Sequence, residues 1–349
     1  MKHLPALDGL RAVAILIVAT SHIVTSLVPG GFGVTLFFFI SGFIITRMMF
    51  GQDFGWGSIK GFYVRRFFRL APALFAFIAI SGVTMRLLGH VIPLQDYLAT
   101  LFYYANYHSY AISADFLSPF VVTWSLAIEE HFYFGFPLLF LLSGRRLVAC
   151  LAAILVAVAL WRCALVFVWH APTARTYCGT DARIDSIAWG CLLSCLIHAR
   201  SKVLDAIGSR AGVACGFALL LASFVVRNDA FRETIRYSLQ GAGLFPLFCA
   251  LFWTGTADKR VQAALESRPA RFIGNISYSL YLYHFLALCV TMVVAPGSVP
   301  VRLLALPLGL ALATASYYLV ENPLRRYGSR LAKALEKPKA GAGDAPATV

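Results

Sequence analysis

Charged residues are scarce in this sequence, and their scarcity excludes a soluble globular domain. Asp, Glu, Lys and Arg make up only 13% of the 349 residues, whereas hydrophobic residues make up 59% and the mean hydropathy is +0.74. The apolar residues fall in repeated blocks of about twenty, the length at which a helix crosses a bilayer. The sequence therefore predicts an all-α, polytopic integral membrane protein.

Other absences narrow the possibilities further. The eight cysteines lack the spacing of a disulfide framework or a zinc site, so no metal is expected. The sequence shows no internal repeat and no second domain, and its first apolar run lacks an Ala-x-Ala cleavage signal, so this run is interpreted as a retained span. The net charge of +14 does not indicate a nucleic-acid partner, because basic residues gather in the cytoplasmic loops of membrane proteins.

Ten apolar segments are predicted to span the membrane, namely 10–29, 32–50, 70–89, 120–142, 147–170, 184–199, 211–226, 237–256, 272–295 and 301–321. The segment 94–112 is ambiguous because polar residues interrupt it. With ten spans and a cytoplasmic N-terminus, the outer side holds Arg175, Arg183, Arg227, Arg232, Arg236 and Arg302. Most other basic residues then lie inside, whereas an eleventh span would place more of them outside. The positive-inside rule therefore favours ten spans and makes 94–112 an outer or re-entrant element.

The end of the chain changes in composition. Pro323 is expected to end the last span, and the basic pair after it is expected to hold the tail inside. Residues 1–328 are assigned to one membrane domain and 329–349 to a cytoplasmic tail. The tail is predicted to be disordered, because its last residues are rich in Ala, Gly, Pro and Lys. A multi-pass protein of the cytoplasmic (inner) membrane is expected.

The first apolar run carries two residues that are costly in lipid. Arg11 and His22 are eleven positions apart, which is three helical turns plus roughly 20° and about 16 Å of rise, so both side chains leave one face of a helix. Imidazole titrates near neutral pH, so His22 is a candidate general base, placed near mid-depth. Arg11, at the cytoplasmic end, would hold a phosphate or carboxylate. In the alternative, Arg11 reaches the interface and His22 bonds a neighbouring helix.

Two further clusters lie on the cytoplasmic side and in the fourth span. Arg65, Arg66 and Arg69 fall on one helical side and fit either a lipid-facing anchor or a site for a phosphate-rich cytosolic cofactor. Glu129 and Glu130 point about 100° apart, so they cannot do the same job. One is expected to orient an imidazole or to bind substrate, while the other pairs with an arginine.

Polar residues near the outer side suggest contacts with a substrate or between helices. Asp181 and Asp185 are one turn apart and could flank Arg183, as an ion-pair cluster or as a site for sugar hydroxyls. The tyrosines before His284 fit an aromatic belt with interhelical hydrogen bonds. Ser41 precedes a glycine but has no base beside it in the sequence, so packing is favoured over a nucleophile.

Seven blocks in this order resemble the acyltransferase-3 family of integral membrane acyltransferases. They are LDGLRAVAILIVATSH (7–22), GGFGVTLFFFISGF (30–43), FYVRRFFRLAPAL (62–74), TWSLAIEEHFYF (123–134), DARIDSIAWG (181–190), ISYSLYLYH (276–284) and VENP (320–323). The resemblance implies ten helices with both termini cytoplasmic. It also implies transfer of an acyl group, most often acetyl, from cytosolic acyl-CoA. The acceptor would be a hydroxyl of a sugar, polysaccharide or lipid-linked glycan at the outer face.

Several residues match the family's motifs. Arg11 and His22 match its Arg-x10-His pair, which is essential for transfer, Arg65 and Arg66 match its basic motif, and Glu130 falls in its acidic motif. Three positions depart from the family's pattern: Thr35 where an acid is frequent, His131 where Gln is frequent, and Asn275 where a basic residue is common. This sequence is expected to lack the hydrolase-like outer domain fused to some members, so either the membrane domain completes the transfer or a separate extracytoplasmic partner receives the acyl group.

These observations combine into one hypothesis with one rival. Coenzyme A would bind through the phosphates to the three clustered arginines, its arm would follow the Arg11 face, and His22 would act as base or be acylated itself. One of the two glutamates would hold the imidazole tautomer. The acceptor would contact residues near the outer mouth, namely Asp181, Arg183, Asp185, His284 and Trp124. The rival is a transporter or flippase without covalent chemistry. Membrane lipid is a further partner, and the oligomeric state is left open.

Overall fold

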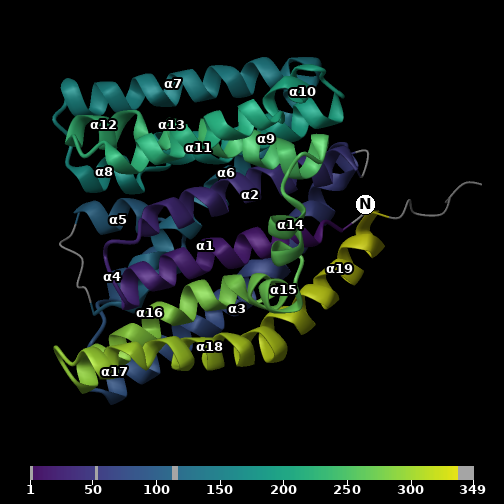
Figure 1. Cartoon of the computed structure of the whole chain (residues 1–349). Helices are drawn as coiled ribbons and strands as arrows, with labels where there is room; N and C mark the ends of the chain where they lie inside the picture. Colours follow the sequence, from purple (N-terminus) through teal and green to yellow (C-terminus); the bar gives the residue numbers. More distant parts are fainter. Residues whose placement is uncertain (1–2, 52–53, 112–116, 337–349) are drawn as a thin grey trace, which may run out of the picture.

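Long helices lie side by side in this protein (Figure 1). The computed structural model describes residues 3–51, 54–111 and 117–336, and within these ranges every regular element is helical. The all-α fold expected from the apolar blocks is therefore confirmed. Six helical stretches are long and apolar enough to cross a membrane: Pro5–Ile23, Gly30–Phe50, Trp56–Leu87, Pro119–Phe167, Ser277–Val294 and Val299–Glu336.

Within the described ranges each of the ten expected segments coincides for most of its length with one α-helix. These helices are α1 (Pro5–Ile23), α2 (Gly30–Phe50), α3 (Ile59–Leu87), α6 (Trp124–Ser143), α7 (Leu147–Phe167), α9 (Thr180–His198), α11 (Arg210–Val225), α13 (Arg236–Cys249), α16 (Ser277–Val294) and α18 (Ala305–Ser316). The other α-helices are α4 (Leu94–Leu101), α5 (Ala105–Ala111), α8 (Thr173–Cys178), α10 (Val203–Ile207), α12 (Asp229–Thr234), α14 (Lys259–Leu265), α15 (Arg268–Asn275), α17 (Val299–Leu303) and α19 (Asn322–Glu336). The count of ten membrane crossings stays a prediction.

Helix α1 lies in the middle of the bundle and packs against α2, α15 and α16. Pro5 stands in its first turn, where the missing N–H would have had no helical partner. The helix ends at Ile23, six positions before the expected boundary, and α2 begins directly after Pro29. His22 therefore lies in the last turn of α1 rather than near mid-depth.

Two glycines let α2 and α9 approach closely. A side chain at Gly42 would collide with the carbonyl oxygen of Ile187, and one at Gly190 with that of Phe39. The two backbones thus touch where no Cβ intervenes. This contact holds α9, which carries Asp181, Arg183 and Asp185, against α2, which carries Ser41.

The ambiguous segment forms two short helices, α4 and α5, at the end of the bundle opposite the N-terminus (Figure 1). They have 8 and 7 residues, so each spans only about 12 Å, far less than the hydrocarbon core of a bilayer. Tyr103 between them has a positive φ of 56°, which breaks the helix. Asp96 accepts a hydrogen bond from Ser118 at 2.7 Å, tying the segment to the start of the next helical stretch. Residue 112 lies outside the described residues.

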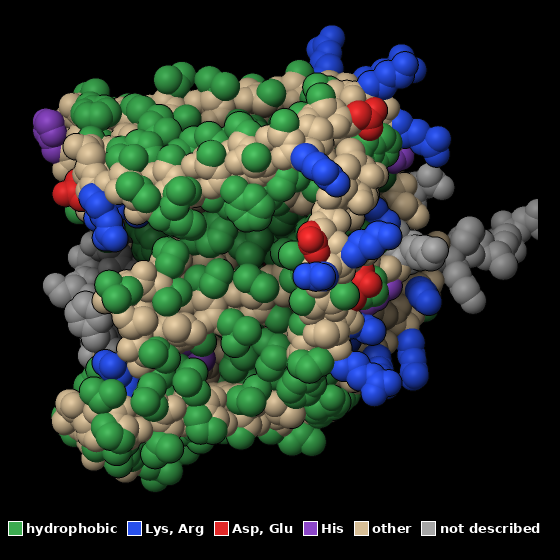
Figure 2. Space-filling model, viewed as in Figure 1, with side chains coloured by type: hydrophobic (Ala, Val, Ile, Leu, Met, Phe, Trp, Pro, Cys, Tyr) green, Lys and Arg blue, Asp and Glu red, His purple; other side chains and the backbone are tan. Residues whose placement is uncertain are grey.

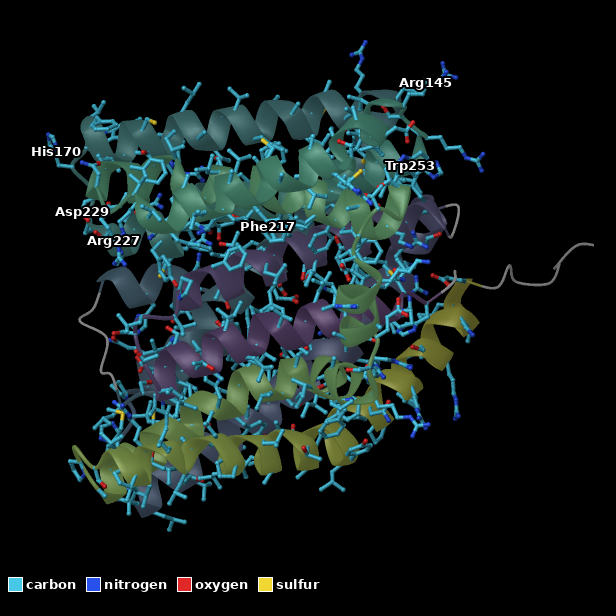
Figure 3. All side chains as sticks on the ribbon, viewed as in Figure 1. Arg145, His170, Phe217, Arg227, Asp229 and Trp253 are labelled. Atoms are coloured by element: carbon cyan, nitrogen blue, oxygen red, sulfur yellow. The ribbon has the colours of Figure 1, made fainter. Side chains whose placement is uncertain are left out.

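Basic side chains gather at the end where the N-terminus and α19 lie (Figures 1 and 2). Arg145 and Trp253 lie at this end, whereas His170, Arg227 and Asp229 lie at the other (Figure 3). Arg145 belongs to the predicted inner loops and Arg227 to the outer ones, so the charge distribution supports the orientation proposed from the sequence.

The last span does not end at Pro323, and the prediction that it would is wrong. A π-helical turn at Tyr317–Glu321 leads directly into α19, where Pro323 occupies the first turn and needs no N–H partner. Residues 329–336, expected in a disordered tail, continue α19, which packs along α3. Residues 337–349 lie outside the described residues.

Candidate active site

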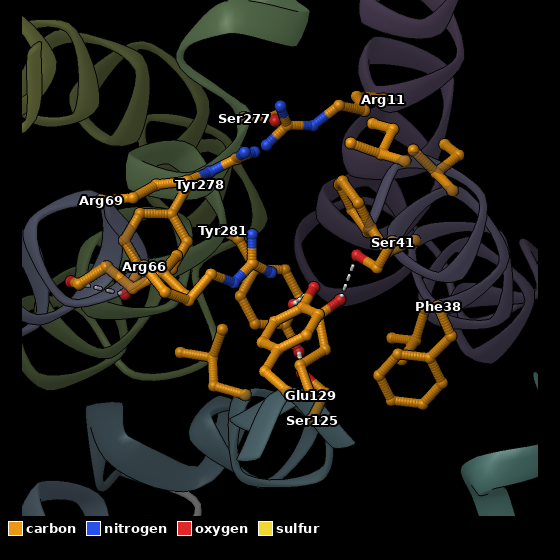
Figure 4. Close-up of a pocket in the computed structure, with 17 residues that line it drawn as sticks. Arg11, Phe38, Ser41, Arg66, Arg69, Ser125, Glu129, Ser277, Tyr278 and Tyr281 are labelled. Atoms are coloured by element: carbon orange, nitrogen blue, oxygen red, sulfur yellow. Dashed lines mark hydrogen bonds between the residues drawn. The ribbon is translucent and has the colours of Figure 1, made fainter. Parts of the chain in front are cut away.

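An open cavity of about 60 Å³ lies among α1, α2, α3, α6 and α16. Three guanidinium groups line it, from Arg11, Arg66 and Arg69, together with the carboxylate of Glu129 (Figure 4). The ends of the Arg11 and Arg69 side chains meet beside Ser277 (Figure 4). All three arginines come from the half of their helix nearest the basic end of the bundle, the end predicted to be cytoplasmic. The lining therefore carries an excess of positive charge, which favours an anionic ligand.

Two hydrogen bonds hold the carboxylate of Glu129, the acidic side chain among the described lining residues, in place. Ser41 donates to Oε1 of Glu129 at 2.8 Å, and the Tyr133 hydroxyl donates to Oε2 at 3.3 Å. The guanidinium of Arg66 lies 3.3 Å from the centroid of the Tyr133 ring. Both carboxylate oxygens of Glu129 thus accept a hydrogen bond from a neutral hydroxyl.

Of the three clustered arginines of α3, Arg65 does not line the cavity. Arg65 points away from the cavity, and its Nη1 donates to Glu336 of α19 at 2.7 Å. Arg66 and Arg69 line the cavity, where Arg11 joins them. The sequence placed all three on one helical side, but their separation around α3 is wide enough for Arg65 to face α19 instead.

The two adjacent glutamates also separate, as their 100° offset requires. Glu129 lines the cavity, whereas Glu130 does not. Oε1 of Glu130 is buried and has no hydrogen-bond partner among the described residues. Neither carboxylate bonds His22, so neither holds its tautomer in this structure.

His284, and not a glutamate, is the hydrogen-bond partner of His22. Nδ1 of His22 lies 2.9 Å from Nε2 of His284, and the two rings stack with 4° between their planes. Nδ1 of His284 lies 3.1 Å from the carbonyl oxygen of Leu280, which can only accept. The proton of a neutral His284 is therefore on Nδ1, and its Nε2 accepts from Nδ1–H of His22. This chain of bonds leaves Nε2 of His22 with its lone pair free, as a base requires.

Helix α16 connects the cavity to this histidine pair. Ser277 and Tyr281 line the cavity, and His284 follows one turn later, with its ring centroid 5.8 Å from that of Tyr281. Arg11 and His22 thus both face α16, as their spacing on α1 predicted. His22 is exposed, while His284 is buried. The pair stands where a molecule in the cavity and one outside it could meet.

The outer polar residues do not form the expected ion-pair cluster. Arg175 and Trp161 bond Asp181, and these hydrogen bonds outweigh burial and hold the pKa of Asp181 below its usual range. Asp185 pairs with Arg162 at 2.7 Å, both side chains being fully buried. Each carboxylate is therefore taken by an arginine from another part of the chain.

Arg183, which lies between them in sequence, contacts neither. It is fully buried, and it donates to the Thr35 hydroxyl at 3.0 Å and to the carbonyl of Tyr177 at 3.1 Å. Its guanidinium lies 3.9 Å from the ring of Tyr237 and 6.0 Å from that of Trp124. The cation is thus held by aromatic rings and neutral acceptors.

Sequence reasoning missed three participants. Ser41 was assigned to packing, yet it bonds Glu129 in the cavity. Arg162, within the expected span 147–170, was given no partner, although it pairs with Asp185, and His284 was not matched to His22. The sequence did offer one indication of these contacts. A polar side chain is costly in lipid, so each polar residue within a span requires a partner.

Comparisons with known proteins agree on one relationship. A family model described as an acyltransferase domain matches residues 4–320. The putative O-acetyltransferase SACOL0978 of Staphylococcus aureus (strain COL) is 30% identical over 358 residues, covering 94% of this chain and 58% of the relative. The O-acetyltransferase OatA of Staphylococcus aureus (strain NCTC 8325 / PS 47) is 31% identical over 369 residues, covering 97% and 60%. The chain thus spans about three fifths of the length of these relatives. No solved structure matches the chain.

Proposed function

Because the chain belongs to the acyltransferase-3 family, we propose that it transfers an acyl group, acetyl first of all, from acyl-CoA to a hydroxyl of a sugar, polysaccharide or lipid-linked glycan. The observation that carries this proposal is the arginine-lined cavity on the cytoplasmic half of the bundle, whose lining reaches Tyr281, one turn before His284, which in turn lies 2.9 Å from His22. The protein is a multi-pass membrane protein, and its residence in the inner membrane is part of the proposal.

The donor binds from the cytoplasm in this proposal. Coenzyme A carries several phosphate charges, and Arg11, Arg66 and Arg69 supply the matching cations. The pantetheine arm follows α16 past Tyr281 toward the histidine pair. Arg65 takes no part in this site, because it bonds Glu336.

His22 performs the chemistry as a general base. Its free Nε2 takes the proton of the acceptor hydroxyl while the oxygen attacks the thioester carbon, and the thiolate leaves and recovers a proton. In the two-step variant Nε2 attacks the thioester first and the acyl group passes from the imidazole to the hydroxyl. In both variants His284 acts as a positioning residue that holds Nδ1–H of His22.

The donor site is tested with the purified full chain and acetyl-CoA. Arg66→Gln/Arg69→Gln is expected to weaken acetyl-CoA binding by about 10–100-fold, because two charge-assisted contacts to phosphate are lost. Thermal stabilisation by titrated acetyl-CoA measures this change. Arg65→Gln, on the same helix but outside the cavity, is the matched control and should bind as the wild type does. A wild-type protein that acetyl-CoA does not stabilise would favour the transporter reading instead.

The positioning role of His284 predicts a contrast between two substitutions. His284→Leu removes the acceptor of the His22 proton and is expected to lower the rate of acetyl transfer by about 10-fold or more. His284→Gln keeps both an acceptor and a donor of similar reach, so it should retain more activity than the leucine variant. Acetyl-CoA affinity and thermal stability are measured alongside. Equal rates for the two variants, at equal stability, would contradict the role.

A further inference from the structure

A second open cavity, of about 520 Å³, lies at the outer end of the bundle among α8, α11, α12, α13 and the turn between α1 and α2. Arg227, Arg232 and Arg236 line it, and the lining residues that the structure describes include no Asp or Glu. Arg227 lies at the end opposite the N-terminus, where further basic side chains are visible (Figures 2 and 3). The cavity is therefore cationic and distinct from the arginine-lined cavity near Arg11.

This concentration of arginine runs against the general charge bias of a membrane protein. Basic residues are few on the predicted outer side, and three of those assigned there converge on this single cavity. A mere topology signal would place them on the inner side. Their convergence here calls for a ligand of opposite charge.

The three arginines are only weakly neutralised by the protein. Arg232 reaches Asp229 at 3.4 Å, and this exposed pair contributes about 0–1 kcal/mol. Arg236 donates to the Tyr237 hydroxyl at 3.0 Å, and its buried Nε has no hydrogen-bond partner among the described residues. In the part of the chain that the structure describes, no ion pair joins Arg227 to a carboxylate.

A fourth cation lies directly behind the cavity wall. Tyr177 and Tyr237 line the cavity and also contact the guanidinium of Arg183, which lies 5.4 and 3.9 Å from their ring centroids. The carboxylates nearest to Arg183 in sequence are occupied by Arg162 and Arg175. Arg183 therefore adds positive potential to the same wall without a carboxylate of its own.

The cavity also lies at the level where transfer would occur. Ser21 lines it and is the neighbour in sequence of His22, in the last turn of α1. We infer that this cavity binds an anionic group, a carboxylate or a phosphate, on the glycan that receives the acyl group. The statement that the anionic molecule is the acyl acceptor rests on the proposed function. The anion site itself does not depend on that function.

The test is a binding experiment that needs no acyl transfer. The full chain is placed in nanodiscs of neutral phosphatidylcholine, and two matched pairs of probes are titrated by microscale thermophoresis. Trigalacturonate is compared with its neutral methyl ester, and glucose 1-phosphate with glucose. We expect at least one charged probe to bind about tenfold more tightly than its neutral partner, with the preference falling as salt rises. The pair that shows the preference identifies the anion.

Variants separate this cavity from other charges. Arg227→Gln/Arg232→Gln should lose the preference for the charged probe, whereas Arg302→Gln, an outer arginine outside the cavity, should keep it. Equal binding of charged and neutral probes, or loss of preference in the Arg302 variant as well, would overturn the inference. Acetyl-CoA stabilisation is measured on the same samples. A protein that prefers the anion but ignores acetyl-CoA would refute the proposed transferase while leaving the anion site standing.

Discussion

Replacing His22 by alanine is expected to lower acetyl transfer by about 10²–10⁴-fold while acetyl-CoA still binds. The imidazole is the group whose free Nε2 would take the proton of the acceptor, and His284 holds the other nitrogen. The donor cavity is lined by other residues, one helical turn or more from the pair, so its affinity should not change. Transfer of radiolabelled acetyl to glycan in membranes, together with thermal stabilisation by acetyl-CoA, measures both quantities.

A second histidine serves as the control. His170 is exposed at the same outer end of the bundle and contacts neither cavity, so His170→Ala should transfer at the wild-type rate. Undiminished acceptor labelling by the His22 variant would refute its role as base and as acyl carrier alike. Loss of labelling together with loss of acetyl-CoA stabilisation would instead indicate a damaged fold.

Arg162→Met is expected to destabilise the protein by about 3–5 kcal/mol, the largest change of stability that the structure predicts. The Arg162 guanidinium bonds Asp185, the Ser238 hydroxyl and two carbonyl oxygens, and thereby joins α7 to α9, α12 and α13. Its removal leaves the carboxylate of Asp185 buried with only the hydroxyl of Ser238. Resistance to unfolding by sodium dodecyl sulfate measures the loss.

Two further variants make that expectation specific to a buried charge. Arg162→Met/Asp185→Leu should be more stable than the single variant, because no unpaired carboxylate remains. Arg232→Met breaks an exposed pair with Asp229 and should change stability by less than about 1 kcal/mol. A double variant no more stable than Arg162→Met would show that the lost bonds to carbonyl oxygens, and not the unpaired acid, dominate.

The parts of the site that were predictable from sequence are those set by a single helix. Arg11 and His22 face the same helix because their spacing alone places them on one side of α1. Glu129 and Glu130 take different environments for the same reason. The sequence also showed that Thr35 stands where the family frequently has an acid. It did not show the consequence, which is that Arg183 donates a hydrogen bond to the hydroxyl of Thr35 at that position.

Contacts between different helices could not be predicted from the spacing of residues along one helix. His22 and His284 are 262 positions apart, and no local rule pairs them. Arg65 and Arg66 are adjacent in a basic run, yet one bonds α19 and the other lines the cavity, because the direction in which α3 packs decides between them. The sequence suggested that Asp185 pairs with its neighbour Arg183, but its partner in the structure is Arg162 of α7.

The sequence by itself determined that this chain is an all-helical membrane protein, which segments are helical, and which residues on one helix share a face. These properties follow from local quantities, namely the apolar length that a bilayer requires and the 3.6-residue turn. The tertiary structure decided which titratable groups pair, where the two arginine-lined cavities lie, and which nitrogen of His22 is free. These depend on how distant helices pack, and a polar group in an apolar interior takes whatever partner that packing brings within reach.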